Sequence, residues 1–524
     1  MQLARVIATS AAVAATRSRN EKVAALSDTL REAVESGAPV EVVTDYLAGV
    51  LPQRRIGVGW RGMAKLPEPA ESPSLLVTEV DAALTAIGVL SGQGSTAQRS
   101  AAVAELFGRA TADEQAWLRG LITGEMRQGA GDGVMLKAIA VAAEVDELAV
   151  RRAVMLAGFA GPVAAAALTG GSAALDEVLL EVGRPLRPML AASAPDIASA
   201  LADGVEVALD SKLDGIRIQA HLDHGTVRLF TRTLDDVTDR LPEVVEAVAA
   251  LSADTAVLDG EVIAEADGRP QPFQVTGSRT MSSADPDRVR TEIPLSTYFF
   301  DLLHLDGRDL VDVPALERWS LLSEVAPAHV VPRLLTSDVT EAEQFFADRL
   351  TAGHEGVVVK APQAPYAAGR RGAGWVKVKP RHTLDLVVLA VEWGSGRRRG
   401  WLSNIHLGAR DAETGELVMP GKTLGGTVTH PGWVPVGKTF KGMTDEMLAW
   451  QTERFRELQV ADDGWVVTVR PEQVVEIAFD GVQRSTRYPG GVALRFARVV
   501  RYRNDKSASE ADTIAAVQSY LPAR

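Results

Sequence analysis

A chain of 524 residues, with 46% hydrophobic and 23% charged side chains, is too long for one core and too apolar to be disordered. No apolar run approaches the ~20 residues that span a bilayer, and the absence of cysteine excludes disulfides, thiol catalysis and zinc ribbons. The net charge of −13 argues against non-specific coating of nucleic acid, although a local basic patch could still contact phosphates. About two to four globular domains are therefore expected.

The first part of the chain, residues 1–182, is predicted to be all-helical. Its first residues, "MQLARVIATSAAVAATRSRNEK", lack the compact basic start and long apolar centre of an export signal, so we interpret them as the first helix. Val23, Leu26 and Leu30 fall on one helical face. Thr111 and Glu114 have the spacing of a capping box ahead of an apolar stripe.

The rest of the chain predicts a linker and two further domains. Prolines interrupt any helix in residues 183–200, which we interpret as the linker. Strands mix with helices over residues 201–380, with a hairpin turn around Gly225. Residues 381–524 are mainly short strands, which suits a small β-barrel, with a helix near 444–458 and a C-terminal helix. The predicted fold class is therefore multidomain: all-α, then α+β, then β-barrel.

The stretch "LDSKLDGIRI" places Lys212 in a predicted strand, with Asp210 and Asp214 on the same face. Gly215 would allow a tight turn, so that Arg217 returns close to the lysine. One interpretation is a solvated ladder of ion pairs, which contributes little to stability. The other is a nucleophilic lysine. An arginine at ~5 Å would then contribute about 3 kcal/mol and lower the lysine pKa by about 2. These ten residues alone favour neither interpretation.

Other unusual residues follow in the same predicted domain. Each has an ordinary explanation in core packing, turn capping or edge-strand protection. Together they predict a site for a nucleoside triphosphate, because two carboxylates can bind Mg²⁺, lysines can hold phosphates and an aromatic ring can stack on the base. No P-loop or Rossmann fingerprint competes with this prediction. The residues are Glu261, Phe299, Phe300, Glu355, Trp375, Lys377 and Lys379.

Seven segments in fixed order resemble the motifs of ATP-dependent DNA ligases, which belong to the covalent nucleotidyltransferases. The segments are "KLDGIR", "FTRT", "LDGEV", "YFFDLLHLDG", "EGVVVK", "WVKVK" and "RFARVVRYRNDK". The N-terminal "LRGLITGEMRQGAGDGVMLKA" is similar to the helical DNA-binding domain of those enzymes, and "VGRPLRPMLA" to their linker. A lone KxDG is a weak signal, but the ordered set covers most of the chain.

The resemblance implies that Lys212 is the lysine that becomes adenylylated. Asp210 stands where the family usually has glutamate near adenine, and Phe300 would stack on that base. Arg217 and Arg232 would engage ribose and phosphates, or the DNA 5′-phosphate. The implied metal ligands are Glu261, which would also contact ribose, and Glu355; the implied phosphate contacts are Arg371, Lys377 and Lys379. In a C-terminal OB-fold, the motif that orients pyrophosphate matches Arg498, Arg501, Arg503, Asp505 and Lys506.

The implied reaction uses ATP and Mg²⁺ to seal nicks in duplex DNA. Lys212 takes AMP from ATP, AMP passes to the 5′-phosphate of the nick, and the 3′-hydroxyl then displaces it. The implied protein is a monomer in the cytoplasm, associated with the nucleoid. A sliding clamp or repair proteins are conceivable partners that the sequence does not identify.

The nearest alternatives share the lysine chemistry. A capping guanylyltransferase is not expected to carry the long helical region, and RNA ligases usually lack the basic C-terminal domain. An NAD-dependent DNA ligase would carry a four-cysteine zinc site, which this chain cannot form. A non-catalytic DNA-binding scaffold would require decay of the motifs, yet every reactive position holds a competent side chain.

Overall fold

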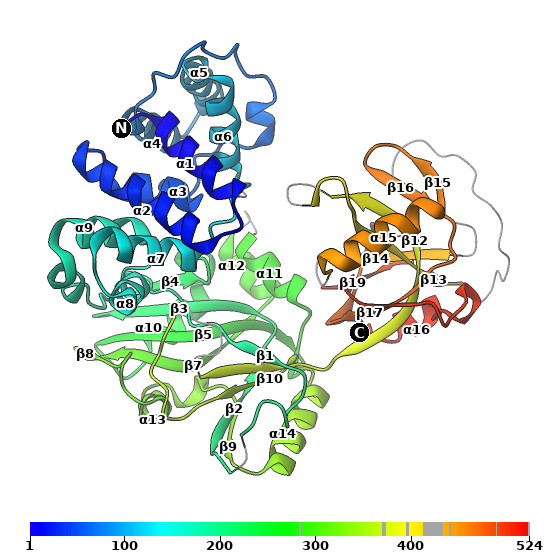
Figure 1. Ribbon diagram of the computed structural model, residues 1–524. Helices are drawn as coiled ribbons and strands as arrows, with labels where there is room; N and C mark the ends of the chain where they lie inside the picture. The colour runs from blue at the N-terminus through cyan, green and yellow to red at the C-terminus, as the bar shows by residue number, and fades with distance from the viewer. Residues whose placement is uncertain are drawn as a thin grey trace. The chain divides into compact units, whose positions relative to one another are not determined.

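The computed structural model describes residues 1–126, 128–202, 204–281, 285–368, 374–394, 398–411, 433–439, 443–488 and 490–521. The chain divides into two compact units (Figure 1). The first unit comprises Met1–Ala194 and Leu201–Lys377, and the second comprises Pro195–Ala200 and Val378–Arg524. The predicted domain boundaries at residues 182, 200 and 380 stay predictions. None of the described helices is long and apolar enough to cross a membrane.

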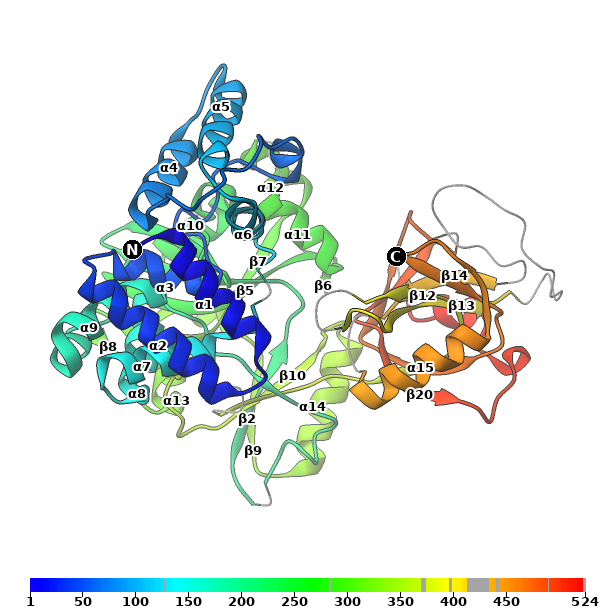
Figure 2. The same ribbon diagram turned by 45° about the horizontal axis from the view of Figure 1, so that its top comes forward.

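The N-terminal part of the first unit is helical, as predicted. Val23, Leu26 and Leu30 are buried on α2, which packs against both α1 and α7 (Figure 2). The predicted capping box begins α6, where Thr111 and Glu114 bond each other's backbone N–H groups. The helices are α1 (Leu3–Ala15), α2 (Arg19–Glu35), α3 (Val40–Ala48), η1 (Trp60–Met63), α4 (Val77–Val89), α5 (Ser95–Gly108), α6 (Ala112–Thr123), α7 (Asp132–Ala143), α8 (Glu147–Ala157) and α9 (Ala160–Asp176).

The remainder of the first unit contains two sheets. One has the order β1-β11-β10-β2-β9 and the other β4-β3-β5-β7-β8, with β6 paired to β5. The strands of the first are β1 (Ala192–Ala194), β2 (Val207–Lys212), β9 (Arg333–Thr336), β10 (Gly356–Lys360) and β11 (Trp375–Val378). Those of the second are β3 (Ile216–Asp223), β4 (Thr226–Thr231), β5 (Thr255–Ala266), β6 (Arg269–Pro270), β7 (Leu295–Leu305) and β8 (Arg308–Asp309).

Helices cover both sheets. In Figure 1, α14 lies along the five-stranded sheet, whereas α10 and α13 pack on the six-stranded sheet. The helices of this part are η2 (Thr238–Arg240), α10 (Pro242–Ala249), α11 (Phe273–Met281), α12 (Pro286–Glu292), α13 (Ala315–Val325), η3 (Pro327–His329) and α14 (Val339–Thr351).

For this region the structure excludes one of two open interpretations, contradicts one prediction and confirms another. The solvated ladder of ion pairs on β2 is excluded, because residues 207–211 are all buried and both faces of the strand are covered. The chain does not return beside Lys212 either, since it leaves the first sheet after β2 and enters the second sheet as β3. The hairpin around Gly225 joins β3 to β4 as predicted, and Gly225 adopts φ +85° there.

The second unit is rich in antiparallel strands, as predicted. β12 lies at the centre of its seven-stranded sheet and pairs with β13, β16 and β17, and β17 pairs with β20. The predicted helix near 444–458 is α15. The elements are β12 (His382–Trp393), β13 (Leu402–Arg410), β14 (Trp433–Lys438), α15 (Asp445–Glu457), β15 (Gln459–Asp462), β16 (Val466–Val469), β17 (Val474–Phe479), β18 (Gly481–Arg484), β19 (Val492–Arg495), β20 (Arg498–Arg503), η5 (Ala508–Glu510) and α16 (Ile514–Gln518).

One fully buried ion pair joins α13 to the six-stranded sheet. Arg318 on α13 bonds both carboxylate oxygens of Asp301 on β7, at 2.7 and 3.0 Å, and both side chains are 0% exposed. Arg318 also donates to the carbonyls of Val313 and Ala364. The pair is fully hydrogen-bonded, so loss of one partner would leave a buried charge without compensation.

We therefore predict that Arg318→Met lowers the free energy of unfolding by about 3–5 kcal/mol. Urea unfolding followed by tryptophan fluorescence, to which buried Trp319 contributes, would measure the change. The matched control is Arg308→Met, because Arg308 forms an exposed pair with Glu317 that contributes about 0–1 kcal/mol. Equal unfolding midpoints for the two variants would contradict the prediction.

Candidate active site

Lys212 lies at the end of β2, directly opposite the start of β10. The Glu355 backbone N–H donates to the Lys212 carbonyl at 2.9 Å, and Gly356 is the register partner of the lysine. The Lys212 Nζ is 2.9 Å from Glu355 Oε2 and donates to the Leu213 carbonyl, also at 2.9 Å. The side chains of Lys212 and Glu355 are 22% and 13% exposed, so the pair is largely desolvated.

The second predicted carboxylate, Glu261, reaches the same place from the other sheet. It lies on β5, and its Oε1 accepts a hydrogen bond from the Gly215 N–H at 3.0 Å. The sequence analysis expected Gly215 to allow a tight turn, but Gly215 does not adopt a positive φ. It is required for space instead, because a Cβ there would collide with the Val262 carbonyl oxygen and with Ile263 Cγ2. Gly215 thus permits the segment that leads into β3 to lie close against β5.

The carboxylates determine the charge of Lys212. Burial alone would lower the pKa of Lys212, but the negative charges of Glu261 and Glu355 outweigh it and hold the pKa above its ordinary value. Burial raises the pKa of Glu261, although Lys212 partly opposes this effect. The resting protein therefore holds Lys212 protonated, and the prediction that Arg217 keeps it neutral is wrong for this state.

Arg217 is committed to other partners. It lies on β3 and bonds both carboxylate oxygens of Asp259, at 2.9 and 2.6 Å. Its Nη1 donates to the Met189 carbonyl at 2.6 Å, and the Tyr366 hydroxyl donates to Asp259 at 2.6 Å. Asp259 is the direct counter-charge of Arg217, whereas the charges that raise the pKa of Lys212 are those of Glu261, Glu355 and Asp214. Asp259 was missed by the sequence analysis.

Asp210 is 2% exposed and lies between two cations that the sequence analysis also missed. Arg333 Nη2 donates to one carboxylate oxygen at 2.8 Å, and Lys360 Nζ lies 2.6 Å from the same oxygen. These two cations outweigh burial and lower the pKa of Asp210. A signal for Lys360 was present, because a lysine ends the otherwise apolar strand "GVVVK" just as Lys212 ends its own strand.

The two neighbouring phenylalanines of β7 differ in burial. Phe299 is 0% exposed in the core, whereas Phe300 is half-buried and meets Trp375 edge to face at 5.7 Å between ring centroids. The Lys360 ammonium lies over both rings, 4.6 Å from the centroid of Phe300 and 4.2 Å from that of Trp375. Lys360 thus links the Phe300 ring to Asp210.

The other predicted phosphate ligands are more dispersed. Arg232 is exposed after β4, and Lys377 is half-buried on β11. Arg371 lies outside the described residues. Lys379 belongs to the second unit, where its Nζ is 3.5 Å from Asp480.

The predicted pyrophosphate motif lies on β20 and the turn that follows it. Each of its cations pairs with a carboxylate. Arg498 meets Asp480 at 2.9 Å and Arg501 meets Glu476 at 2.7 Å; Arg503 meets Asp385 and Asp505 at 2.9 and 2.7 Å, and Lys506 meets Asp385 at 2.6 Å.

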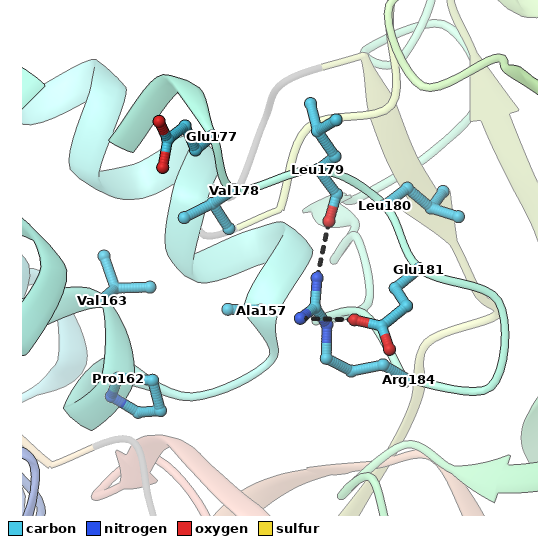
Figure 3. A pocket seen from close by; sticks show the side chains of 9 residues that line it. All are labelled: Ala157, Pro162, Val163, Glu177, Val178, Leu179, Leu180, Glu181 and Arg184. Atoms are coloured by element: carbon cyan, nitrogen blue, oxygen red, sulfur yellow. Dashed lines mark hydrogen bonds and ion pairs between the residues drawn. The ribbon is translucent and has the colours of Figure 1, made fainter. Parts of the chain in front are cut away.

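One cavity of about 410 Å³ lies among α8, α9 and the segment after α9 (Figure 3). In its lining, Arg184 bonds Glu181 at 2.8 Å and the Leu179 carbonyl at 2.6 Å through its terminal nitrogens, whereas its Nε is buried without a hydrogen-bond partner among the described residues. None of the predicted site residues lines this cavity.

Comparison with known proteins places this geometry in a family. The sequence matches the DNA ligase N terminus over residues 61–140, the ATP dependent DNA ligase domain over 188–379 and the ATP dependent DNA ligase C terminal region over 398–506. It is 60% identical to a probable DNA ligase from a Nocardioides species, over 99% of both chains. This chain belongs to the ATP-dependent DNA ligases.

This ligase is also 56% identical to DNA ligase B from Mycobacterium tuberculosis, over 99% of this chain and 100% of that one. The solved structure Pmar-Lig_PreS3 superposes with a TM-score of 0.60 over 95% of this ligase and 99% of that chain, at 17% identity. At that identity the superposition supports the fold alone. The comparisons confirm the predicted order of helical region, nucleotidyltransferase domain and strand-rich C-terminal region.

We predict that Glu355→Gln lowers the pKa of Lys212 in the nucleotide-free ligase, because it removes one of the negative charges that favour the ammonium. Trace acetylation of Lys212 at a series of pH values, read by mass spectrometry, would locate the titration midpoint. The control is Glu317→Gln, an exposed carboxylate paired with Arg308. An unchanged midpoint in Glu355→Gln would contradict the assigned origin of the pKa.

Proposed function

We propose that Lys212 is the nucleophile of this ligase and that the enzyme seals 5′-phosphate/3′-hydroxyl nicks in duplex DNA. The observation that carries the proposal is the desolvated Lys212 Nζ held 2.9 Å from Glu355, with Glu261 bonded to the adjoining glycine. ATP supplies the adenylyl group. The lysine nitrogen forms a bond to the α-phosphorus, the bond from that phosphorus to the bridging oxygen breaks, and pyrophosphate leaves with the electron pair.

The lysine must lose its proton before it can attack, and the site provides a way to favour that loss. Glu261 and Glu355 would bind Mg²⁺, which would supply positive charge next to the phosphates. Within the described residues no group of three His, Asp or Glu side chains is arranged to hold a metal. Two carboxylates fit Mg²⁺, which usually takes one or two of them and completes its shell with waters and substrate phosphates. With both carboxylates engaged, Lys212 would lose the charges that raise its pKa.

The base would lie against Phe300. Asp210 is proposed to act on the base pocket through its partners, because its carboxylate already accepts bonds from Arg333 and Lys360. Lys360 lies over the Phe300 ring, so Asp210 fixes the cation that polarises this aromatic surface. Arg217 is proposed to hold the segment at Met189 as well as to face the phosphates.

The remaining roles follow the family motifs. Arg232, Arg371, Lys377 and Lys379 are proposed to contact phosphates of ATP or DNA. The second unit is proposed to be an OB-fold whose motif, Arg498 to Lys506, orients pyrophosphate during attack by Lys212. Residues 1–182 are proposed to bind duplex DNA through phosphate contacts, with little dependence on base sequence. A monomer acting on nicked DNA is the simplest assembly consistent with these roles.

Alternative covalent nucleotidyltransferases predict different donors or acceptors. A capping guanylyltransferase would accept GTP, and an RNA ligase would require RNA ends. An NAD-dependent ligase would accept NAD, but this chain has no cysteine for the zinc site expected in that class. A non-catalytic scaffold would accept no nucleotide covalently.

We predict that only ATP, among labelled ATP, GTP and NAD, transfers AMP to the protein, and that Lys212→Ala abolishes the transfer. The physical reason is that this amine is the proposed nucleophile. The phosphoramidate bond between lysine and AMP is hydrolysed in acid, so the labelled band on a gel should disappear after acid treatment. Lys65→Ala is the control, since Lys65 is an exposed lysine of the helical region.

Sealing of a nicked duplex with ATP and Mg²⁺ should likewise be lost in Lys212→Ala. Full labelling of Lys212→Ala, or preferential labelling by GTP, would overturn the proposed function.

A further inference from the structure

The predicted pyrophosphate motif of the second unit is held by carboxylates that the motif itself does not contain. Arg498 is paired with Asp480, and Arg501 with Glu476. Asp385 differs from these two carboxylates because it binds two motif cations at once. This residue precedes the motif by more than a hundred positions in sequence.

Asp385 is fixed in a largely desolvated position near the start of β12. Its side chain is 12% exposed. Its backbone N–H donates to the Asp512 carboxylate at 2.8 Å, and its carbonyl accepts from the Asp512 N–H at 2.8 Å. The backbone of β12 also pairs with β17, where Glu476 is the register partner of Asp385. The carboxylate therefore has little freedom to move.

The two cations that Asp385 binds differ in what they can still contact. Arg503 is 14% exposed and directs Nε and Nη2 to Asp505, at 2.8 and 2.7 Å, and Nη1 to Asp385 at 2.9 Å. Most of its donor directions are thus used inside the protein. Lys506 is 31% exposed, and its ammonium, which has three donors, directs one of them to Asp385 at 2.6 Å. Lys506 is the better placed of the two to meet a phosphate.

We infer that Asp385 is a positioning residue for the first chemical step: it clamps Arg503 and Lys506 so that Lys506 presents its ammonium to the departing pyrophosphate. This inference rests on the proposed function. Asp385 and Asp505 together balance the charges of Arg503 and Lys506, so the role of Asp385 is to place the Lys506 ammonium rather than to add positive charge. A lysine side chain is long and flexible. Because Asp385 already holds it in place, pyrophosphate binding would not have to bear the entropy cost of ordering it.

Asp385→Asn tests this role, because only the first step involves pyrophosphate. We expect single-turnover adenylylation of Lys212 by ATP to fall by about 10- to 100-fold, the range caused by misplacement of a positioned group. Sealing of a nick that already carries AMP should stay within about twofold of the unmodified enzyme. The pyrophosphate concentration that half-maximally reverses adenylylation should rise in parallel.

Controls separate this role from a structural one and from failure of the proposed function. Glu472→Gln removes an exposed partner of Arg470 in the same unit and should change neither step. In a Lys506→Met background, Asp385→Asn should have little further effect on the first step, because the two residues act together. If Lys506→Met itself adenylylates normally, the motif assignment in the proposed function fails, whatever Asp385 does.

Three results would overturn the inference itself. Faster adenylylation in Asp385→Asn would show that the carboxylate competes with pyrophosphate, and unchanged adenylylation would show that it is a passive counter-ion. Equal losses in both steps would show a structural role. If Asp385→Asn does not fold, Asp385→Glu replaces it, because it keeps the charge and displaces the carboxylate by one methylene. The same selective loss in the first step is then expected.

Discussion

The ion pair between Lys212 and Glu355 is the interaction on which the proposed chemistry depends. A lysine removed from water without a partner would lose its proton or destabilise the fold. Here, Glu355 and Glu261 keep the ammonium charged within a largely buried site. The same two carboxylates are the proposed ligands of Mg²⁺. In the proposed mechanism, the site would link the protonation state of the nucleophile to the arrival of the metal and the triphosphate.

Further buried ion pairs hold the site in place. Asp210 joins β2 to Arg333 and Lys360, and Asp259 joins β5 to Arg217. Such pairs add little net stability compared with a well-packed apolar core, but they are costly to break and they fix geometry. The residues of these ion pairs lie on the strands that carry the ligase motifs or on strands paired with them. The ion pairs therefore help to hold Lys212, Glu261 and Phe300 in position.

Much of this architecture could be predicted from sequence because its signals are local. The helical face of α2, the capping box of α6 and the hairpin at Gly225 depend on neighbouring residues. The partners of buried charges depend on pairing between distant strands. Arg217 lies opposite Glu261 in the β3–β5 register, and it bonds Asp259 on the same strand, which no local pattern indicates. The crossing from one sheet to the other after Lys212 was missed for the same reason, and with it the charge of the lysine in the resting state.

The most direct test is the pH dependence of single-turnover adenylylation at saturating ATP and Mg²⁺. The account predicts a rate that rises with pH and reaches a plateau well below the ordinary lysine pKa, because carboxylates that hold the metal would no longer favour the ammonium. The nucleotide-free enzyme should instead show Lys212 titrating above the ordinary value. A rate that keeps rising tenfold per pH unit up to the ordinary lysine pKa would contradict the account, since Lys212 would then remain an ordinary ammonium at the moment of attack.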